Sequence, residues 1–165
     1  MKKYPSRKNI RLYNYDYSQN ALYFITICIN QKKCLLGKII EGKMHLNDAG
    51  KLVENFYLKI EEYSPNFSCL NYVIMPNHIH FIIQVSNSKN TTKQIKLSDA
   101  IIWFKRMTTN QYIKNIKHKN WPKFTKRLWQ RNYYEVIIKD DLMFYKIEQY
   151  IQDNPYSWPL DKYFC

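Results

Sequence analysis

Two apolar segments separated by only two residues restrict the fold of this chain more than any other feature. Residues 69–75 read CLNYVIM and residues 78–85 read HIHFIIQV, and both are rich in the β-branched and aromatic side chains that strands favour. Pro76 and Asn77, which lie between them, predict a tight break in the chain. The two segments therefore predict two strands that follow each other directly.

The remaining segments complete an alternating order of elements. Residues 23–30 and 133–139 also have strand composition, and a short hairpin is expected around Glu41-Gly42. Helical spacing of apolar residues predicts three helices, which begin after Asn47, after Ser98 and after Asp140 or Asp141. Apart from the hairpin, the order is strand, helix, strand, strand, helix, strand, helix.

The first six of these elements match the split βαβ pattern of ferredoxin-like folds. We therefore predict an α+β fold with a mostly antiparallel sheet, helices packed on one face and an extra C-terminal helix. The length of 165 residues predicts a single domain over residues 1–165, in which residues 1–20 form a basic N-terminal arm. No apolar run reaches the roughly 18 residues of a membrane span, and the first 20 residues lack the apolar core of a signal peptide. We expect a cytoplasmic protein without a membrane partner.

The charge of the chain favours a nucleic-acid partner. Lys and Arg number 26 against 13 Asp and Glu, a net charge of +13, and aromatic residues make up 16% of the chain. Basic side chains attract phosphates, and aromatic faces can stack on unpaired bases. A basic surface with no binding role is the alternative. The chain contains neither GxxxxGK[ST] nor GxGxxG, so ATP-driven and dinucleotide chemistries have no visible motif.

Two histidines stand one residue apart in the apolar run at residues 78–85. Because side chains alternate along a strand, His78 and His80 point to the same face, with their Cα atoms about 6.5–7 Å apart. Two imidazoles at that spacing can converge on one metal ion. An HxH pair alone is a weak signal, since two histidines satisfied by local hydrogen bonds would give the same pattern.

A tyrosine and an asparagine stand four residues apart in the last predicted helix. Tyr150 and Asn154 therefore share a face with Met143 and Ile147, and that face should turn toward the sheet. Asn154 can offer a carbonyl oxygen to a metal, and Tyr150 a nucleophilic oxygen. The alternative is a buried tyrosine and an ordinary helix end before Pro155.

Three segments taken together resemble the REP-associated tyrosine transposases, relatives of the single-tyrosine insertion-sequence transposases in the HUH nuclease superfamily. The resemblance runs in order from about Arg7 to Trp158. The segments are residues 15–37, 72–83 and 128–158. Their most specific parts are the MPNHIH motif at residues 75–80 and WQRNYY at 129–134 followed by YIQDNP at 150–155.

The resemblance implies a set of site residues. His78 and His80 fall on the histidines of the HUH motif, Tyr150 falls on the catalytic tyrosine, and Asn154 falls near the metal. The implied cofactor is Mg²⁺ or Mn²⁺. Mg²⁺ prefers oxygen ligands, whereas imidazole suits Mn²⁺ and later metals better, so a mixed site of this kind can work with either ion. The implied enzyme is a metal-dependent transposase that nicks and rejoins single-stranded, hairpin-bearing DNA through a 5′-phosphotyrosine intermediate. Relatives occur as monomers and as homodimers, and the sequence chooses neither.

Basic and aromatic residues outside this site are the expected DNA contacts. The residues are Lys3, Arg7, Arg11, Lys105, Arg106, Lys126, Arg127, Trp129, Gln130, Arg131 and Tyr134. The Trp129-Gln130 and Tyr133-Tyr134 pairs match a family signature whose role is either structural or DNA-positioning. Tyr133, Tyr134 and Tyr145 also lie near Tyr150 in sequence, so the nucleophile is not unique on this ground alone.

Two other functions remain open at this point. A ferredoxin-like module that binds nucleic acid without cutting it would explain the charge and the aromatic residues. A metal-dependent nuclease that uses water would also explain the histidine pair.

Overall fold

The computed structural model describes residue 16, residues 19–87 and residues 95–164. Its centre is a four-stranded sheet in which every neighbouring pair of strands is antiparallel. In spatial order the strands are β4 (Phe67–Met75), β5 (His78–Val85), β1 (Ala21–Cys28) and β6 (Tyr134–Ile138). This is the order of a split βαβ sheet, so the predicted ferredoxin-like class is confirmed. Most of the predicted basic arm, including Lys3, Arg7 and Arg11, lies outside the described residues.

The hairpin of β4 and β5 forms where the sequence predicts it. Met75 pairs with His78, so Pro76 and Asn77 make a two-residue turn. The register of this hairpin shifts between Cys69 and Tyr72. At that irregularity the buried Tyr57 hydroxyl lies 2.9 Å from the carbonyl oxygen of Leu70, which gives this carbonyl a donor.

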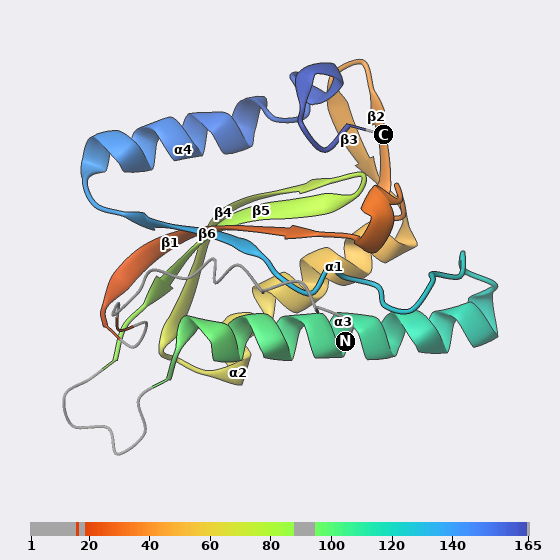
Figure 1. The fold of residues 1–165 in the computed structure, drawn as a ribbon, viewed down its shortest axis with the longest axis horizontal. Helices are drawn as coiled ribbons and strands as arrows, with labels where there is room; N and C mark the ends of the chain where they lie inside the picture. Colours follow the sequence, from red (N-terminus) through yellow and green to blue (C-terminus); the bar gives the residue numbers. More distant parts are fainter. Residues whose placement is uncertain (1–15, 17–18, 88–94, 165) are drawn as a thin grey trace, which may run out of the picture.

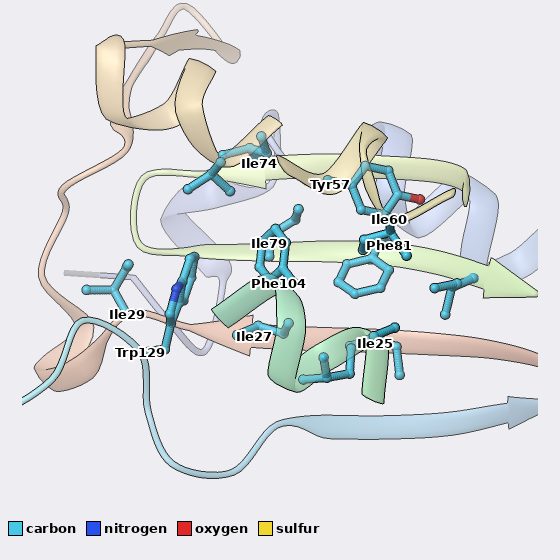
Figure 2. Close-up of a cluster of buried hydrophobic side chains, with 14 of the residues drawn as sticks. Ile25, Ile27, Ile29, Tyr57, Ile60, Ile74, Ile79, Phe81, Phe104 and Trp129 are labelled. Carbon is cyan, nitrogen blue, oxygen red and sulfur yellow. The ribbon is translucent and has the colours of Figure 1, made fainter. Parts of the chain in front are cut away.

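Three helices cover one face of the sheet (Figure 1). They are α1 (Asp48–Leu58), α2 (Ile60–Tyr63) and α3 (Leu97–Lys119). Ile25 and Ile27 of β1 and Ile79 and Phe81 of β5 are completely buried against them. Figure 2 shows these side chains meeting Tyr57, Ile60, Phe104 and Trp129 in one cluster. Burial of this much apolar surface is the main force that holds the helices on this face.

Helix α4 (Asp141–Asp153) lies across the opposite face of the sheet (Figure 1). A second, smaller apolar cluster lies beneath it, in which Phe24 and Ile82 of the sheet pack with Ile151 of the helix. Met143 and Ile147 pack against the same cluster. The predicted face of the last helix therefore does turn toward the sheet, and it carries Tyr150 with it.

Local capping agrees with the sequence at two of the three helices. The Asn47 side chain accepts from the backbone N–H groups of Ala49 and Gly50, and the Asp140 side chain accepts from that of Met143. The predicted cap at Ser98 is wrong. Helix α3 begins at Leu97, two residues before the predicted start at Asp99, and the Asp99 carboxylate accepts from the backbone N–H of Lys96 instead.

A short hairpin precedes α1. Strands β2 (Gly37–Ile40) and β3 (Lys43–Leu46) are joined by Glu41 and Gly42, both with positive φ, as a tight two-residue hairpin requires. Within the described residues, no helix is both long and apolar enough to cross a membrane.

Candidate active site

The two histidines of β5 lie under α4, on the face of the sheet opposite the main core. Both are buried, with exposed fractions of 0% for His78 and 1% for His80. Their Nε2 atoms are 2.9 Å apart, and their ring centroids are 4.5 Å apart. The strand alternation predicted from the sequence therefore brings two imidazole nitrogens to a single point.

Asn77 determines which nitrogen of His78 carries the proton. The Asn77 amide nitrogen donates to the carbonyl oxygens of Lys32 (3.0 Å) and Tyr163 (2.8 Å). Its oxygen therefore faces Nδ1 of His78 at 2.8 Å and can only accept. His78 consequently holds its proton on Nδ1, and its Nε2 presents a bare lone pair.

Thr26 plays a different part at His80. Its hydroxyl lies 2.7 Å from Nδ1 of His80, across the β1–β5 pair. A hydroxyl can either donate or accept, so Thr26 satisfies His80 in both neutral tautomers. In one tautomer Nε2–H of His80 donates to the bare Nε2 of His78. In the other, both Nε2 lone pairs face the same point, which is the arrangement that a shared cation needs.

Burial keeps both imidazoles neutral. It lowers the pKa of His78 to about 3, with the nearby Lys162 adding to the shift. Burial also lowers the pKa of His80 well below its ordinary value, helped by His78 and then by Lys162. Since only a neutral imidazole binds a metal, the pair is in the ligating state at neutral pH.

A carboxylate joins the histidine pair from the segment after α4. Asp161, whose side chain is 4% exposed, places Oδ2 4.0 Å from Nε2 of His78. The candidate ligand atoms of His78, His80 and Asp161 all lie within 4.8 Å of one another. The sequence interpretation missed Asp161, Asn77 and Thr26. Asn77 stands inside the MPNHIH motif, which was its one signal, whereas Asp161 and Thr26 lie far from the histidines in sequence.

Tyr150 on α4 presents its hydroxyl to this cluster. The oxygen is 3.3 Å from Nε2 of His80, and the ring packs edge-on against Phe24. The side chain is half-buried, and burial raises the pKa of its phenol, with the Asp161 carboxylate raising it further. Tyr150 is therefore protonated at neutral pH.

Of the three other tyrosines near Tyr150 in sequence, Tyr145 and Tyr133 lie in other surroundings. Tyr145 is 62% exposed and packs against Phe144. Tyr133 packs its ring near the Lys105 ammonium. Tyr134 lines the same cavity as Tyr150, at its rim.

Asn154 lies one turn after Tyr150, as the spacing predicts. It is 3% exposed, and its Oδ1 atom is buried and has no hydrogen-bond partner among the described residues. A buried carbonyl oxygen without a donor is costly, and a bound cation is one group that would satisfy it.

A cavity of about 660 Å³ opens beside the cluster, between α4 and the sheet. Its lining is Phe24, Thr26, His80, Tyr134, Val136, Met143, Lys146, Ile147, Tyr150, Asn154, Ser157, Leu160, Asp161 and Lys162. One end therefore holds the titratable and nucleophilic groups, and the other end is mostly apolar.

The predicted DNA contacts divide into residues that are exposed to solvent and residues whose side chains are bonded inside the protein. Arg106, Lys126, Arg127 and Arg131 are exposed. The last three belong to the segment between α3 and β6, which is tied to the histidine end of β1 because the Leu128 carbonyl accepts from Asn30 N–H. Their positions are compatible with phosphate binding beside the site.

Lys105 and Trp129 are engaged inside the protein. The Lys105 ammonium donates to the carbonyl oxygens of Gln130 (3.0 Å), Arg131 (3.3 Å) and Asn132 (3.4 Å), and burial lowers its pKa to about 8. Trp129 is 4% exposed, and its indole N–H donates to the Thr108 hydroxyl at 2.8 Å. Backbone N–H of Gln130 donates to the Cys28 carbonyl. These contacts favour the structural one of the two roles predicted for the Trp129-Gln130 pair.

Comparison with known proteins places this chain among transposases. Residues 17–154 match the family described as "Transposase IS200 like". An uncharacterised protein of Haemophilus influenzae is 36% identical over 94% of this chain and 92% of its own length. A candidate REP-associated tyrosine transposase of the same organism is 27% identical over 87% of this chain and 74% of its own length.

Two solved structures share the fold. A REP-associated tyrosine transposase bound to a REP hairpin superposes with a TM-score of 0.60 at 18% identity, over 89% of this chain and 73% of the other. A candidate transposase of Deinococcus radiodurans gives a TM-score of 0.53 at 15% identity, over 87% of this chain and 95% of the other.

Proposed function

Because the chain belongs to the IS200-like transposase family and thus serves DNA transposition, we propose that it cuts and rejoins single-stranded DNA with Tyr150 as nucleophile. The observation that carries the proposal is the 3.3 Å approach of the Tyr150 hydroxyl to His80, beside the converging histidine nitrogens. A nucleophile next to a candidate metal site, at the mouth of an open cavity, is what phosphodiester cleavage requires.

The residues present fit a divalent cation, Mg²⁺ or Mn²⁺. His78, His80 and Asp161 would hold it, and Asn154 offers a buried oxygen that has no other partner among the described residues. When bound, such an ion withdraws charge from a non-bridging phosphate oxygen and orients the phosphate for in-line attack. Asn77 and Thr26 keep the two rings in place and supply the outer hydrogen bonds.

The proposed reaction balances without an external energy source. The Tyr150 oxygen attacks phosphorus, the bond to the 3′ oxygen breaks, and a 5′-phosphotyrosine and a free 3′-hydroxyl result. The phenol is protonated beforehand because its pKa is raised, so it releases its proton to solvent during attack, and the leaving 3′ oxygen takes one proton up. A second 3′-hydroxyl then attacks the phosphotyrosine, which restores Tyr150 and joins the strand.

The partner that we propose is a DNA hairpin with a single-stranded flank. The REP-associated tyrosine transposase that shares the fold is bound to a REP hairpin in its solved structure. In this chain, the exposed Arg106, Lys126, Arg127 and Arg131 supply positive charge for the DNA backbone. Lys146 and Lys162 line the cavity at the reacting phosphate.

The test is covalent trapping on DNA. The protein is mixed with end-labelled hairpin oligonucleotides from the DNA flanking its own gene, with Mn²⁺ or Mg²⁺, and run on a denaturing gel. We expect a protein–DNA adduct that disappears in Tyr150→Phe and persists in Tyr145→Phe, a matched change at an exposed position of the same helix. Cutting that survives Tyr150→Phe would mean that water is the nucleophile. Binding without cutting that survives conversion of both histidines to Ala would mean a non-catalytic module.

A further inference from the structure

The apolar end of the cavity has no role in the chemistry proposed above. It is formed by Phe24 and Val136 of the sheet and by Met143 and Ile147 of α4. Phe24, Val136 and Ile147 carry no hydrogen-bonding group and the Met143 thioether is only a weak acceptor, so this end mainly offers van der Waals contact and an apolar surface. It is continuous with the end that holds His80 and Tyr150.

Aromatic rings connect the two ends of the cavity. Phe24 stacks on the His80 ring at 5.3 Å between centroids, with 21° between the ring planes. The same ring meets Tyr150 edge-on at 5.9 Å. A flat group that enters beside Tyr150 would therefore lie next to an aromatic wall built around the reacting tyrosine.

Tyr134 lines the cavity between its two ends, because it pairs with Thr26 of β1 while Val136, two residues further on, pairs with Phe24. It is 47% exposed on the edge strand β6, and the Lys162 ammonium lies 5.3 Å from its ring centroid. Lys146 and Lys162 both line the cavity. The rim thus combines an aromatic ring with two cations, whereas the interior is apolar.

We propose that this end of the cavity is a slot for one unstacked nucleobase adjoining the scissile phosphate, held by stacking and apolar contact. The proposal rests on the proposed function, since the phosphate at Tyr150 determines where the base falls. One sugar joins a base to its phosphate, so a strand whose phosphate reaches Tyr150 carries the neighbouring bases to this cavity. Charge complementarity supports the same occupant, with cations at the rim for phosphates and an apolar interior for the base.

The chemistry of the lining also predicts how selective the slot is. Base edges are read by hydrogen bonds, and the apolar end has no donor and no acceptor stronger than the Met143 thioether. Every base has a face that can stack, so removing the base should cost more than exchanging it for another. The slot therefore detects that a base is present rather than which base it is.

The test is an abasic scan of the single-stranded flank of a hairpin substrate. Each nucleotide in turn is replaced by an abasic sugar, and binding to the Tyr150→Phe protein is measured by fluorescence anisotropy beside adduct formation by the wild type. We expect one position where base loss weakens binding roughly 5- to 100-fold, the range expected for stacking of one base. Exchange among the four bases there should change binding less than about threefold.

Two variants connect that position to the slot. Tyr134→Ala removes the rim ring, and Met143→Trp fills the apolar end without touching the histidines. In the Tyr150→Phe background, each should weaken binding of the intact DNA but not of the DNA abasic at that position. Tyr145→Ala, on exposed surface of α4, should change neither. Thermal unfolding of each variant shows whether it is folded.

The outcomes separate this proposal from the proposed function. If no position responds to base loss, or if the slot variants weaken intact and abasic DNA equally, the slot is overturned even where the adduct forms. If the wild type forms no adduct on any DNA while one abasic position still weakens binding through Tyr134 and Met143, the slot stands and tyrosine cleavage does not.

Discussion

The Nε2 atoms of His78 and His80 face each other at 2.9 Å, while their Nδ1 atoms are held from outside by Asn77 and Thr26. The outer partners leave the inner nitrogens free to act together. Changes to the outer partner Thr26, to the candidate ligand Asp161 and to the two histidine rings should therefore affect metal binding and folding stability to different extents.

Thr26→Val should weaken metal binding with little effect on the fold. The change keeps the shape of the side chain but removes the hydroxyl that satisfies Nδ1 of His80. Loss of such an outer hydrogen bond typically lowers metal affinity roughly 10- to 100-fold. Titration calorimetry with Mn²⁺ measures the affinity. Thr108→Val is the control, because Thr108 is a buried threonine bonded to Trp129 in the main core. It should cost stability and leave the affinity unchanged.

Asp161→Asn should weaken Mn²⁺ binding roughly tenfold or more, because a charged ligand becomes neutral. Asp153→Asn, at an exposed position near the end of α4, is its matched control. Unchanged Mn²⁺ affinity in Asp161→Asn would remove the carboxylate from the proposed site.

Asn154→Ala should reduce the rise in melting temperature that Mn²⁺ produces, because the Oδ1 atom, which has no partner among the described residues, is lost.

Metal-free protein should lose stability as the pH falls below 6.5. Both histidines have folded-state pKa values below the ordinary value of 6.5, about 3 for His78. At a pH between the folded-state pKa and 6.5, each histidine is protonated in the unfolded chain but not in the folded chain. Acid therefore favours unfolding in this window. Each histidine contributes a slope of about 1.4 kcal/mol per pH unit in this window.

Urea unfolding in a chelator between pH 4 and pH 8 measures this effect. The double change of His78 and His80 to Asn should flatten the pH dependence relative to the wild type. The control variant His45→Asn removes an exposed histidine of β3 and should leave the pH dependence of the wild type unchanged. Equal slopes in all three proteins would mean that the histidine pair is not kept neutral by the fold.

Lys105→Met should destabilise the protein by about 1.5–3 kcal/mol, because the carbonyls of residues 130–132 lose a charged donor. It should leave the salt dependence of DNA binding unchanged. Arg106→Met, at the next position, which is exposed, should leave the stability unchanged. It should instead reduce the slope of log K for DNA binding against log salt concentration by roughly 0.7–0.9. A reduced slope in Lys105→Met would show that this ammonium contacts phosphate after all.

The sheet and its order were predictable because the signals are local. Alternation along residues 78–85, the turn at Pro76-Asn77 and the caps at Asn47 and Asp140 each depend on neighbours a few residues away. The start of α3 was not predictable in the same way. Ser98 and Asp99 are adjacent, both can cap a helix, and it is the Asp99 carboxylate that accepts from the backbone N–H of Lys96.

The site was predictable only along single elements. The strand spacing of His78 and His80 and the helix spacing of Tyr150 and Asn154 put each pair on one face. Which residues complete the cluster depends on tertiary contacts. Thr26 reaches His80 across a strand pair, and Asp161 arrives from beyond α4. Trp129 shows the same limit, because its place in a basic, aromatic segment allows either a structural or a DNA-positioning role, and only its tertiary contacts show that it is buried and bonded to Thr108.

The Thr26 hydroxyl has a consequence for how fast the site can change state. The two neutral forms of His80 exchange when Nε2 gives up its proton, Nδ1 takes one up and the Thr26 hydroxyl turns about one bond, and none of these steps shifts a heavy atom. The hydroxyl rotation is far faster than the repacking of a helix. Ion uptake at the histidine pair should therefore show no slow kinetic phase, because the buried rings are already in position before the ion arrives.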